Sequence, residues 1–469
     1  MEPQALRRSL SSRDLIVYGL LFIGPLAPVG VFGVLDAKSH GSVALVYLVA
    51  TLAMAFTAVS YAQMSRQVPH AGSVYAYAGI GIGRPAGFAA GWLAMLDYLL
   101  IPAVGYLFCG IALHSLVPSV PAWVFTAVAF VSTTLLNLFG VRLAARVGFV
   151  VLLVEIVLLA VFVVAAVVVL IMDGPARPWT SPALGVGGIT TAAVMGAVSV
   201  AVLSFLGFDA IASFAEENTG DERQVGRAVL FCLGVAGLLF VLQTYLAGLL
   251  MPVSPHHLAQ APAEQGTAFY TMTRTAVGVW MQRTFAVVKG IGPAFTAMAA
   301  VAAASRLLYG MARDRGLPKA LAAVDERSQV PRAALLTTAA VSLVVSVWAA
   351  RRADGLDVLV SIVNMGALAA FTLLNVSVVG YHVIRRGSRR WIPHLVVPVL
   401  GAAVCVWIMV SATTLAKIVA AGWLVVGAVV FAVGGRTGGR AGGRAGTSLS
   451  PAGRAAGGTE TGAPSVPGR

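Results

Sequence analysis

The sequence predicts an all-α integral membrane protein with about twelve transmembrane helices. Hydrophobic residues make up 58% of the 469 residues and charged residues 11%, and the mean hydropathy is +0.88. Soluble globular proteins contain about 25% charged residues, so this composition excludes a soluble enzyme, a disordered chain and a disulfide scaffold. Apolar runs long enough to span a bilayer recur along the chain, and they are too continuous for the strands of a β-barrel.

Each expected helix is one of these apolar runs, taken in chain order. The first six are expected at 14–37, 41–64, 86–115, 121–140, 146–172 and 190–215. The last six are expected at 226–251, 284–313, 333–350, 357–384, 393–412 and 417–434. Short loops that contain most of the basic residues separate the runs, which is the pattern that membrane topology produces.

The distribution of Lys and Arg predicts that both chain ends are cytoplasmic. With the C-terminal tail and Arg306 left out, 18 basic residues fall on the side of the membrane that holds the N-terminus and 8 fall on the other side, where Lys289 is counted. Cytoplasmic loops carry this excess in membrane proteins, so the net charge of +14 reflects topology and we expect no nucleic-acid partner. We expect residues 1–13 to be a cytoplasmic segment and the Gly- and Arg-rich residues 435–469 to be a disordered cytoplasmic tail.

The first expected span contains residues that interrupt a helix. Its middle reads Phe22-Ile23-Gly24-Pro25-Leu26-Ala27-Pro28, and proline removes a hydrogen-bond donor and clashes with the preceding turn. Unwound backbone in a membrane persists where protein buries it or where it lines a cavity. The amides freed there favour an anionic group, and the freed carbonyls favour a cation or an ammonium group. A helix that is merely kinked at this point is the alternative.

The sixth expected span contains a second candidate break. It reads Ser204-Phe205-Leu206-Gly207-Phe208-Asp209-Ala210, with a glycine close to an acidic residue inside an apolar run. If the chain repeats every five helices, spans one and six occupy matching positions. Paired interrupted helices at matching positions of two inverted halves indicate the midplane binding site of a transporter.

Three acidic residues lie inside apolar runs: Asp97, Glu155 and Asp209. A charged side chain at the centre of a bilayer costs about 2.5–3.5 kcal/mol on insertion scales, so each should face the protein interior. Asp209 is best placed to meet a substrate ammonium group, with a helix cap as its alternative. Glu155 suits a proton carrier because an apolar surrounding favours an uncharged carboxyl group; a structural contact between helices is its alternative. Asp97 either contributes to function or orients its helix.

Five segments form a combination that points to a known superfamily. They are Ser60-Tyr61 through Tyr77, Gly87-Phe88 through Leu99, SFLGFDA at 204–210, ASRLLYGMARDRGLPK at 304–319 and NMGALAAFTLLNVSVV at 364–379. In combination they resemble the amino acid–polyamine–organocation superfamily, and within it the branch of bacterial putrescine importers and amino acid permeases. The resemblance covers roughly residues 14–412.

This resemblance implies a leucine-transporter-type core of five-plus-five inverted repeats over 14–384, in which helices one and six are discontinuous. Residues 385–434 would add two transmembrane helices. It also implies alternating access, with proton coupling or exchange in place of ATP. Some members use a lysine in helix five as a proton switch. The nearest ionisable residue inside the membrane part of that helix here is Glu155, to which we assign proton coupling from its own chemistry.

In the superfamily the two helix breaks bind the substrate, and the matching residues form the expected site. Ile23, Gly24, Pro25 and Leu26 would line one side and Phe205, Gly207, Phe208 and Asp209 the other, with Asp97 and Tyr98 beside them. Amino acid carriers usually hold a carboxylate on the amides of a Gly-rich break. Pro25 and Pro28 have no amide hydrogen, which favours a substrate with ammonium groups alone. Asp209 and Asp97 would bind such a cation, and aromatic rings can stack over it.

These observations favour a secondary active permease of the cell membrane that moves an amino acid or a small polyamine such as putrescine, coupled to protons. Its partners would be the small-molecule substrate, H⁺ and the lipid bilayer. An exchanger of the same fold, a sensor that retains the fold without transport, and a channel are the alternatives. The sequence lacks motifs for phosphate binding, zinc-dependent hydrolysis or a serine nucleophile. We therefore expect neither an enzyme nor a metal or cofactor.

Overall fold

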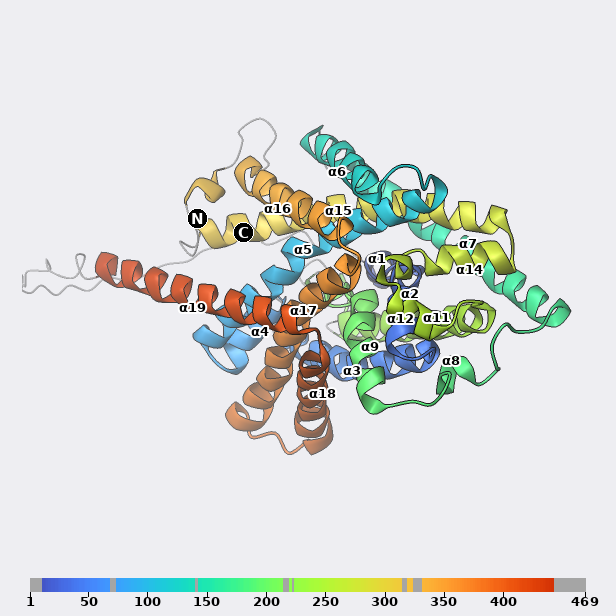
Figure 1. Ribbon diagram of the computed structural model, residues 1–469. Helices are drawn as coiled ribbons and strands as arrows, with labels where there is room; N and C mark the ends of the chain where they lie inside the picture. Colours follow the sequence, from blue (N-terminus) through green and yellow to red (C-terminus); the bar gives the residue numbers. More distant parts are fainter. Residues whose placement is uncertain are drawn as a thin grey trace, which may run out of the picture.

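The computed structural model describes residues 11–67, 73–139, 142–213, 219–221, 223–313, 319–323 and 331–442, and over these residues it contains helices and no strand (Figure 1). The helices pack side by side in a bundle, which agrees with the all-α class that the sequence predicts. The segment expected at 1–13 and the tail expected at 435–469 fall largely outside the described residues.

The chain begins with a helix in two pieces, continues through long helices, and is interrupted again near residue 206. The elements up to this point are α1 Ser12–Ile23, α2 Ala27–Lys38, α3 Val43–Met64, α4 Ser73–Gly81, α5 Arg84–Leu116, α6 Ala122–Phe139, α7 Arg142–Met172, α8 Ser181–Leu184, α9 Thr191–Ala201 and the short helix η1 Val202–Phe205.

The second half contains further long helices joined by short ones, two of which have the wider π-helical turn. The elements are α10 Ala210–Ser213, α11 Arg223–Leu250, α12 Pro255–Gln260, α13 Pro262–Gln265, α14 Ala268–Ala276, α15 Val279–Arg313, η3 Lys319–Ala322, α16 Arg332–Ala350, α17 Gly355–Val378, π-helical η4 Val379–Arg385, π-helical η5 Ile392–Val396, α18 Val397–Ser411 and α19 Thr414–Gly442. The last helix continues past 434, where we expected the final span to end.

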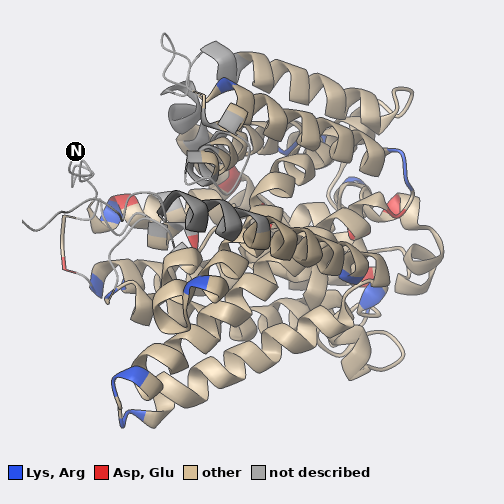
Figure 2. Ribbon diagram, turned by 90° about the vertical axis from the view of Figure 1, so that its left-hand side faces the viewer, with Lys and Arg blue, Asp and Glu red and all other residues tan. Residues whose placement is uncertain are grey.

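Among the described residues, eight helices are long and apolar enough to cross a membrane, and α1 with α2 makes a ninth if the bent pair is one span. The expected spans 121–140 and 190–215 contain shorter apolar helices, Ala122–Leu135 and Thr191–Phe205. The expected span 284–313 falls within α15, which includes basic residues such as Lys289. Figure 2 shows most charged residues at helix ends and in loops, with long uncharged stretches between them. The number twelve and the inverted repeat stay predictions.

Local sequence explains where several helices begin. Ser11 precedes α1 and forms a capping box with Asp14: the Asp14 amide donates to Ser11 Oγ at 3.4 Å, and the Ser11 amide donates to Asp14 Oδ2 at 2.8 Å. These bonds satisfy amides that a helix start leaves free. Thr190 caps α9 in the same way, since its hydroxyl accepts the Ala193 amide at 3.2 Å. Proline stands in the first turn of α2 and α5, where its missing N–H costs no helical bond.

Helix α5 is the centre of the packing, with α15, α17, α6 and α16 around it. Small residues allow the closest approaches. A Cβ atom on Gly366 of α17 would lie 2.8 Å from the Leu93 carbonyl oxygen of α5, and one on Gly105 of α5 would lie 2.9 Å from the Pro293 carbonyl oxygen of α15. Membrane helices pack through such small residues because lipid gives little hydrophobic drive between helices.

The last helix is held on α5 by a reciprocal pair of tryptophans. Trp92 Nε1 donates to the Trp423 carbonyl oxygen and Trp423 Nε1 donates to the Trp92 carbonyl oxygen, each at 2.7 Å. The two rings stack with centroids 4.7 Å apart. Both indole N–H groups are therefore satisfied within an otherwise apolar contact between α5 and α19.

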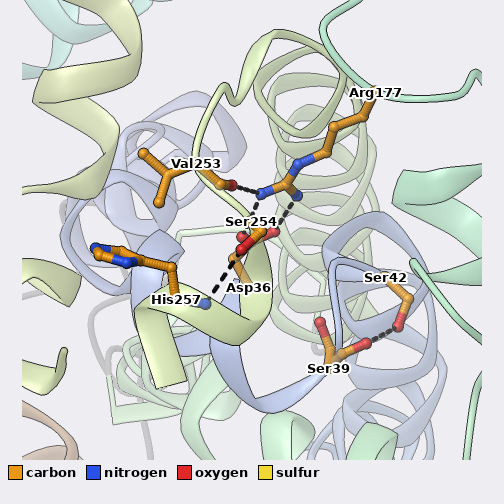
Figure 3. Close-up of polar contacts among 7 residues, drawn as sticks. All are labelled: Asp36, Ser39, Ser42, Arg177, Val253, Ser254 and His257. Atoms are coloured by element: carbon orange, nitrogen blue, oxygen red, sulfur yellow. Dashed lines mark hydrogen bonds and ion pairs between the residues drawn. The ribbon is translucent and has the colours of Figure 1, made fainter. Parts of the chain in front are cut away.

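A buried ion pair joins three segments at one end of the bundle (Figure 3). Arg177, in the loop after α7, donates to both carboxylate oxygens of Asp36 at 2.7 and 2.8 Å, and also to the Val253 carbonyl oxygen after α11. The Asp36 side chain is fully buried and that of Arg177 is 7% exposed. Such a two-pronged pair is directional as well as strong. Nearby, Lys38 pairs with Asp357 at 2.9 Å, which links the end of α2 to the start of α17.

Replacing Arg177 with Gln should destabilise the protein strongly. The Asp36 carboxylate would stay buried without its cation, and breaking a buried pair in this way costs about 3–5 kcal/mol. The measurement is the thermal unfolding midpoint of the purified protein in detergent. Adding Asp36→Asn to Arg177→Gln should recover part of the loss, because the uncompensated charge is then gone.

The matched control is Arg352→Gln. Arg352 also makes a two-pronged pair, with Asp354 at 2.8 Å, but the two side chains are 45% and 47% exposed. Exposed pairs contribute little, so this variant should unfold at the temperature of the unmodified protein. Equal midpoints for the Arg177 and Arg352 variants would contradict the importance of the buried pair.

Candidate functional site

The two helix interruptions expected from the sequence lie against each other in the structure. Helix α1 ends at Ile23 and α2 begins at Ala27, with a bend of 42° between them. Gly24 has φ +71° and Gly207 has φ +115°, a region that side chains disfavour. A Cβ atom on Gly207 would lie 2.8 Å from Cβ of Phe22. The second break therefore packs directly on Phe22, the last residue but one of α1.

Side chains from other helices satisfy the backbone of the first break. Gln243 of α11 donates from Nε2 to the Pro25 carbonyl oxygen at 2.9 Å. The Leu26 amide donates to Glu155 Oε2 of α7 at 3.4 Å. The Ala27 amide donates to the Gly24 carbonyl oxygen at 2.9 Å, which starts α2. An amide and a carbonyl of the break are thus held by one carboxylate and one carboxamide.

The second break is supported in a similar way. Asn364 of α17 donates from Nδ2 to the carbonyl oxygens of Ser199 and Val200, at 2.7 and 3.2 Å. The Gly207 amide donates to Asp209 Oδ1 at 3.1 Å. Asp209 therefore accepts a hydrogen bond from local backbone that precedes α10, and the helix cap that the sequence left open as its alternative stays a prediction.

Glu155 lies beside a buried lysine. Lys289 Nζ of α15 is 3.9 Å from Glu155 Oε1, and the two side chains are 6% and 8% exposed. The ammonium group also lies 6.0 Å from the centre of the Phe108 ring. The topology count placed Lys289 on the external side, which is wrong because α15 begins at Val279 and carries this buried side chain into the bundle. Its position within the expected span 284–313 was the signal that could have identified it.

A cavity of about 160 Å³ opens between the first break, α5, α7, η1 and α15. Its polar lining includes Glu155, Lys289, Thr296 and Ser204, and its remaining walls are mainly apolar. Of the expected site residues, Ile23, Gly24 and Glu155 line this cavity. Leu26 reaches it indirectly, since its amide donates to Glu155. The cavity thus brings both charges of one ion pair to the unwound backbone.

The other expected site residues lie elsewhere. Asp97 on α5 is 7% exposed, and its Oδ1 atom is buried with no hydrogen-bond partner among the described residues. Asp97 interacts electrostatically with Asp209 and with Tyr98. Phe205 and Phe208 are fully buried and pack edge-on or tilted against other rings, with centroids 5.1 Å from Phe240 and 5.6 Å from Phe371 respectively. The expected site therefore divides into a group at Glu155 and a group at Asp97 and Asp209.

Two polar residues at the breaks escaped the sequence reasoning. Gln243 and Asn364 each use the amide nitrogen on a freed carbonyl, and the amide oxygen of each is buried with no partner among the described residues. Asp97 Oδ1 is a third buried acceptor without a donor among the described residues, and none of the three residues lines the cavity at Glu155. In the described part of the chain, no cluster of three or more His, Cys, Asp or Glu could hold a metal ion.

Comparison with known proteins finds similarity to permeases and transporters over nearly the whole chain. The family model for amino acid permease matches residues 15–435. The chain is 28% identical over 443 residues to the low-affinity putrescine importer PlaP of Escherichia coli, which covers 91% of this chain and 93% of that protein. It is 27% identical over 460 residues to a methylthioribose transporter of Bacillus subtilis, covering 92% and 94%. It is 24% identical over 458 residues to the branched-chain amino acid permease BcaP of Bacillus subtilis, covering 91% and 93%.

Replacing Gly207 with Ala should destabilise the contact between the breaks. The backbone strain at positive φ costs about 1–3 kcal/mol, and the added methyl group would press on Phe22. We expect a lower thermal unfolding midpoint. Gly196→Ala on the neighbouring α9 is the control, because the nearest atom to its new Cβ would be the Ser411 carbonyl oxygen at 4.0 Å. A Gly207 variant as stable as the Gly196 variant would disprove the close approach.

Proposed function

Because this chain belongs to the amino acid permease family, we propose that it is a secondary active permease that moves an amino acid or a small polyamine across the cell membrane by alternating access, coupled to protons. The observation that carries the proposal is the contact of two interrupted helices, at Phe22 and Gly207. Interrupted helices that meet in the bundle are the binding geometry of secondary transporters. Its multi-pass membrane location follows from the family and the apolar helices.

Proton coupling rests on Glu155. In its charged form this carboxylate accepts the Leu26 amide and attracts Lys289. A proton on Glu155 would remove that attraction and leave the lysine charge unpaired in an apolar cavity, which is unfavourable. Water reaching the cavity from one side would relieve that cost. Protonation would thereby loosen α7 and α15 from the first break and allow α1 and α2 to change their angle.

The preference for a polyamine as substrate rests on buried acceptor atoms that have no donor among the described residues. Asp97 Oδ1, Gln243 Oε1 and Asn364 Oδ1 are buried without donors among the described residues, and each would accept a hydrogen bond from a substrate N–H group that reached it. Asp209 adds negative charge close to Asp97. Pro25 offers no amide to a carboxylate. These features favour a polyamine such as putrescine over a zwitterionic amino acid. The likeness to PlaP agrees with this choice, and the likeness to BcaP keeps the amino acid as the alternative.

The test of the proposed function is uptake by proteoliposomes with an inward proton gradient. Labelled putrescine should accumulate, and a protonophore should abolish the accumulation. A mixture of labelled amino acids is the comparison, and uptake of these alone would refute the ammonium-only substrate while leaving a permease. Exchange that ignores the gradient would indicate an antiporter. Absence of uptake and of exchange for every solute would refute the permease.

Replacing Glu155 with Gln should separate exchange from accumulation. The carboxamide oxygen can still accept the hydrogen bond from the Leu26 amide, but the carboxamide has no proton that titrates. We therefore expect counterflow exchange of labelled substrate to persist while gradient-driven accumulation falls to the equilibrium ratio of about one. Accumulation should be lost because position 155 no longer carries a proton through the transport cycle.

Two further proteins control the Glu155 experiment. Glu155→Gln combined with Lys289→Gln removes the unpaired buried lysine charge, so it should restore any loss of stability without restoring accumulation. Asp209→Asn should instead weaken both exchange and accumulation of a cationic substrate. A Glu155→Gln protein that accumulates substrate as the unmodified protein does would disprove the coupling role.

A further inference from the structure

A second cavity, of about 430 Å³, lies at the other end of α3 from the Asp36 ion pair. The end of α3, the π-helical η4 and η5, and the turn between them form it. We call it the basic pocket, and it is lined by Gln63, Arg66, Gln67, His382, Arg386, Ser388, Arg390 and His394. Figure 2 shows the turn that joins α17 to α18 projecting at the bottom of the molecule, with its basic residues in blue. This volume is well above the roughly 30 Å³ that one water occupies in the liquid.

The charge of the basic pocket is of one sign. Arg66, Arg386 and Arg390 line it together with two histidines, and the described residues of the lining include no Asp or Glu. Like charges gathered in a hollow repel one another and focus a positive potential. An anion is the partner that such a lining fits.

Several of the lining side chains are fixed by contacts that leave the hollow open. Arg386 donates from Nη1 to Gln67 Oε1 at 2.7 Å, and its guanidinium carbon lies 4.5 Å from the centre of the Tyr381 ring. The His382 and His394 rings stack at 4.1 Å, and Ser388 Oγ lies 2.7 Å from His394 Nδ1. Groups held in this way lose little conformational entropy when a ligand binds.

Two nitrogen atoms of residues that line the basic pocket have no hydrogen-bond partner in the part of the chain that the structure describes. The His382 side chain is 7% exposed, and its Nε2 atom is buried without a hydrogen bond among the described residues. Arg66 Nε is also buried without a hydrogen bond among the described residues. This nitrogen always carries a hydrogen that it can donate. Buried polar atoms nearly always have partners, so Arg66 Nε lacks an acceptor, and His382 Nε2 lacks one when this nitrogen carries the ring proton. The π-helical turns on either side add to this, because such turns occur frequently at functional sites.

We propose that the basic pocket binds a phosphate group. Guanidinium groups match phosphate oxygens in geometry as well as in charge, and arginine is favoured wherever phosphate is recognised. The phosphate would be either free inorganic phosphate or the headgroup of an anionic lipid. The lipid source has local support, because Ile384, Trp391 and Ile392 beside the pocket are 78%, 58% and 71% exposed. Exposed tryptophan and isoleucine suit the boundary between headgroups and acyl chains.

The experiment measures the thermal unfolding midpoint of the full-length protein in a neutral detergent. One arm adds inorganic phosphate against chloride at equal ionic strength, and the other adds phosphatidylglycerol against phosphatidylcholine. We expect a saturable rise in at least one arm. A rise with phosphatidylglycerol alone assigns the site to a lipid headgroup, and a rise with inorganic phosphate assigns it to free phosphate.

The variant pair that tests the site is Arg66→Gln with Arg390→Gln. Loss of each charged hydrogen bond should weaken apparent binding about tenfold or more. The matched control is Arg385→Gln with Arg389→Gln, which removes the same charge from exposed arginines of the same turn that do not line the pocket. If the double variant does not fold, Arg390→Gln alone, an exposed side chain, serves in its place.

The proposal is overturned if neither phosphate nor phosphatidylglycerol raises the midpoint. It is also overturned if the control pair loses as much binding as the pocket pair, because the effect would then be general electrostatic attraction. Retention of phosphatidylglycerol on the protein in native mass spectrometry, lost in the pocket variant and kept in the control, gives a readout that does not depend on stability.

Discussion

Backbone groups that leave a helix inside an apolar bundle must find new hydrogen-bond partners, because neither lipid nor apolar side chains can supply them. Each unsatisfied group costs several kcal/mol in such surroundings. In this protein the partners come from three different helices. Gln243 on α11, Glu155 on α7 and Asn364 on α17 hold the two breaks. The helices α7, α11 and α17 must therefore lie close enough to α1, α2 and η1 for these hydrogen bonds to form.

The same requirement explains why the polar residues form two groups. The Glu155 carboxylate that accepts the freed Leu26 amide is an ionisable contact. Its charge also determines whether Lys289 has a counter-ion. The amide side chains of Gln243 and Asn364 make neutral contacts with freed carbonyls, and their own amide oxygens have no donor among the described residues. The first type suits coupling to protons and the second suits recognition of N–H groups. We propose that the two tasks are divided in this way, with Asp97 and Asp209 on the side of recognition.

How much the sequence could reveal depended on how local each feature is. Pro25 and Gly207 act on their own backbone, so both interruptions were predictable from residue type. The interior position of Asp97 and Glu155 followed from the cost of charge in lipid, and both are buried. The partners of the breaks were not predictable, because Gln243 lies 218 residues from Pro25 along the chain. Lys289 was misplaced because a count of basic residues for topology ignores the need of an interior carboxylate, here Glu155, for a cation.

The reciprocal tryptophan contact has a consequence for how the chain is made. Trp92 and Trp423 are 331 residues apart, and about 17% of the membrane-spanning part of α19 is buried. At ribosomal rates of 5–20 residues per second, roughly 15–65 s pass between the synthesis of the two residues. During that interval the Trp92 face of α5 meets lipid or the insertion machinery in place of its partner. The indole N–H of the nascent protein has no acceptor on α19 until the last helix arrives, so the final helix completes the surface of a central one.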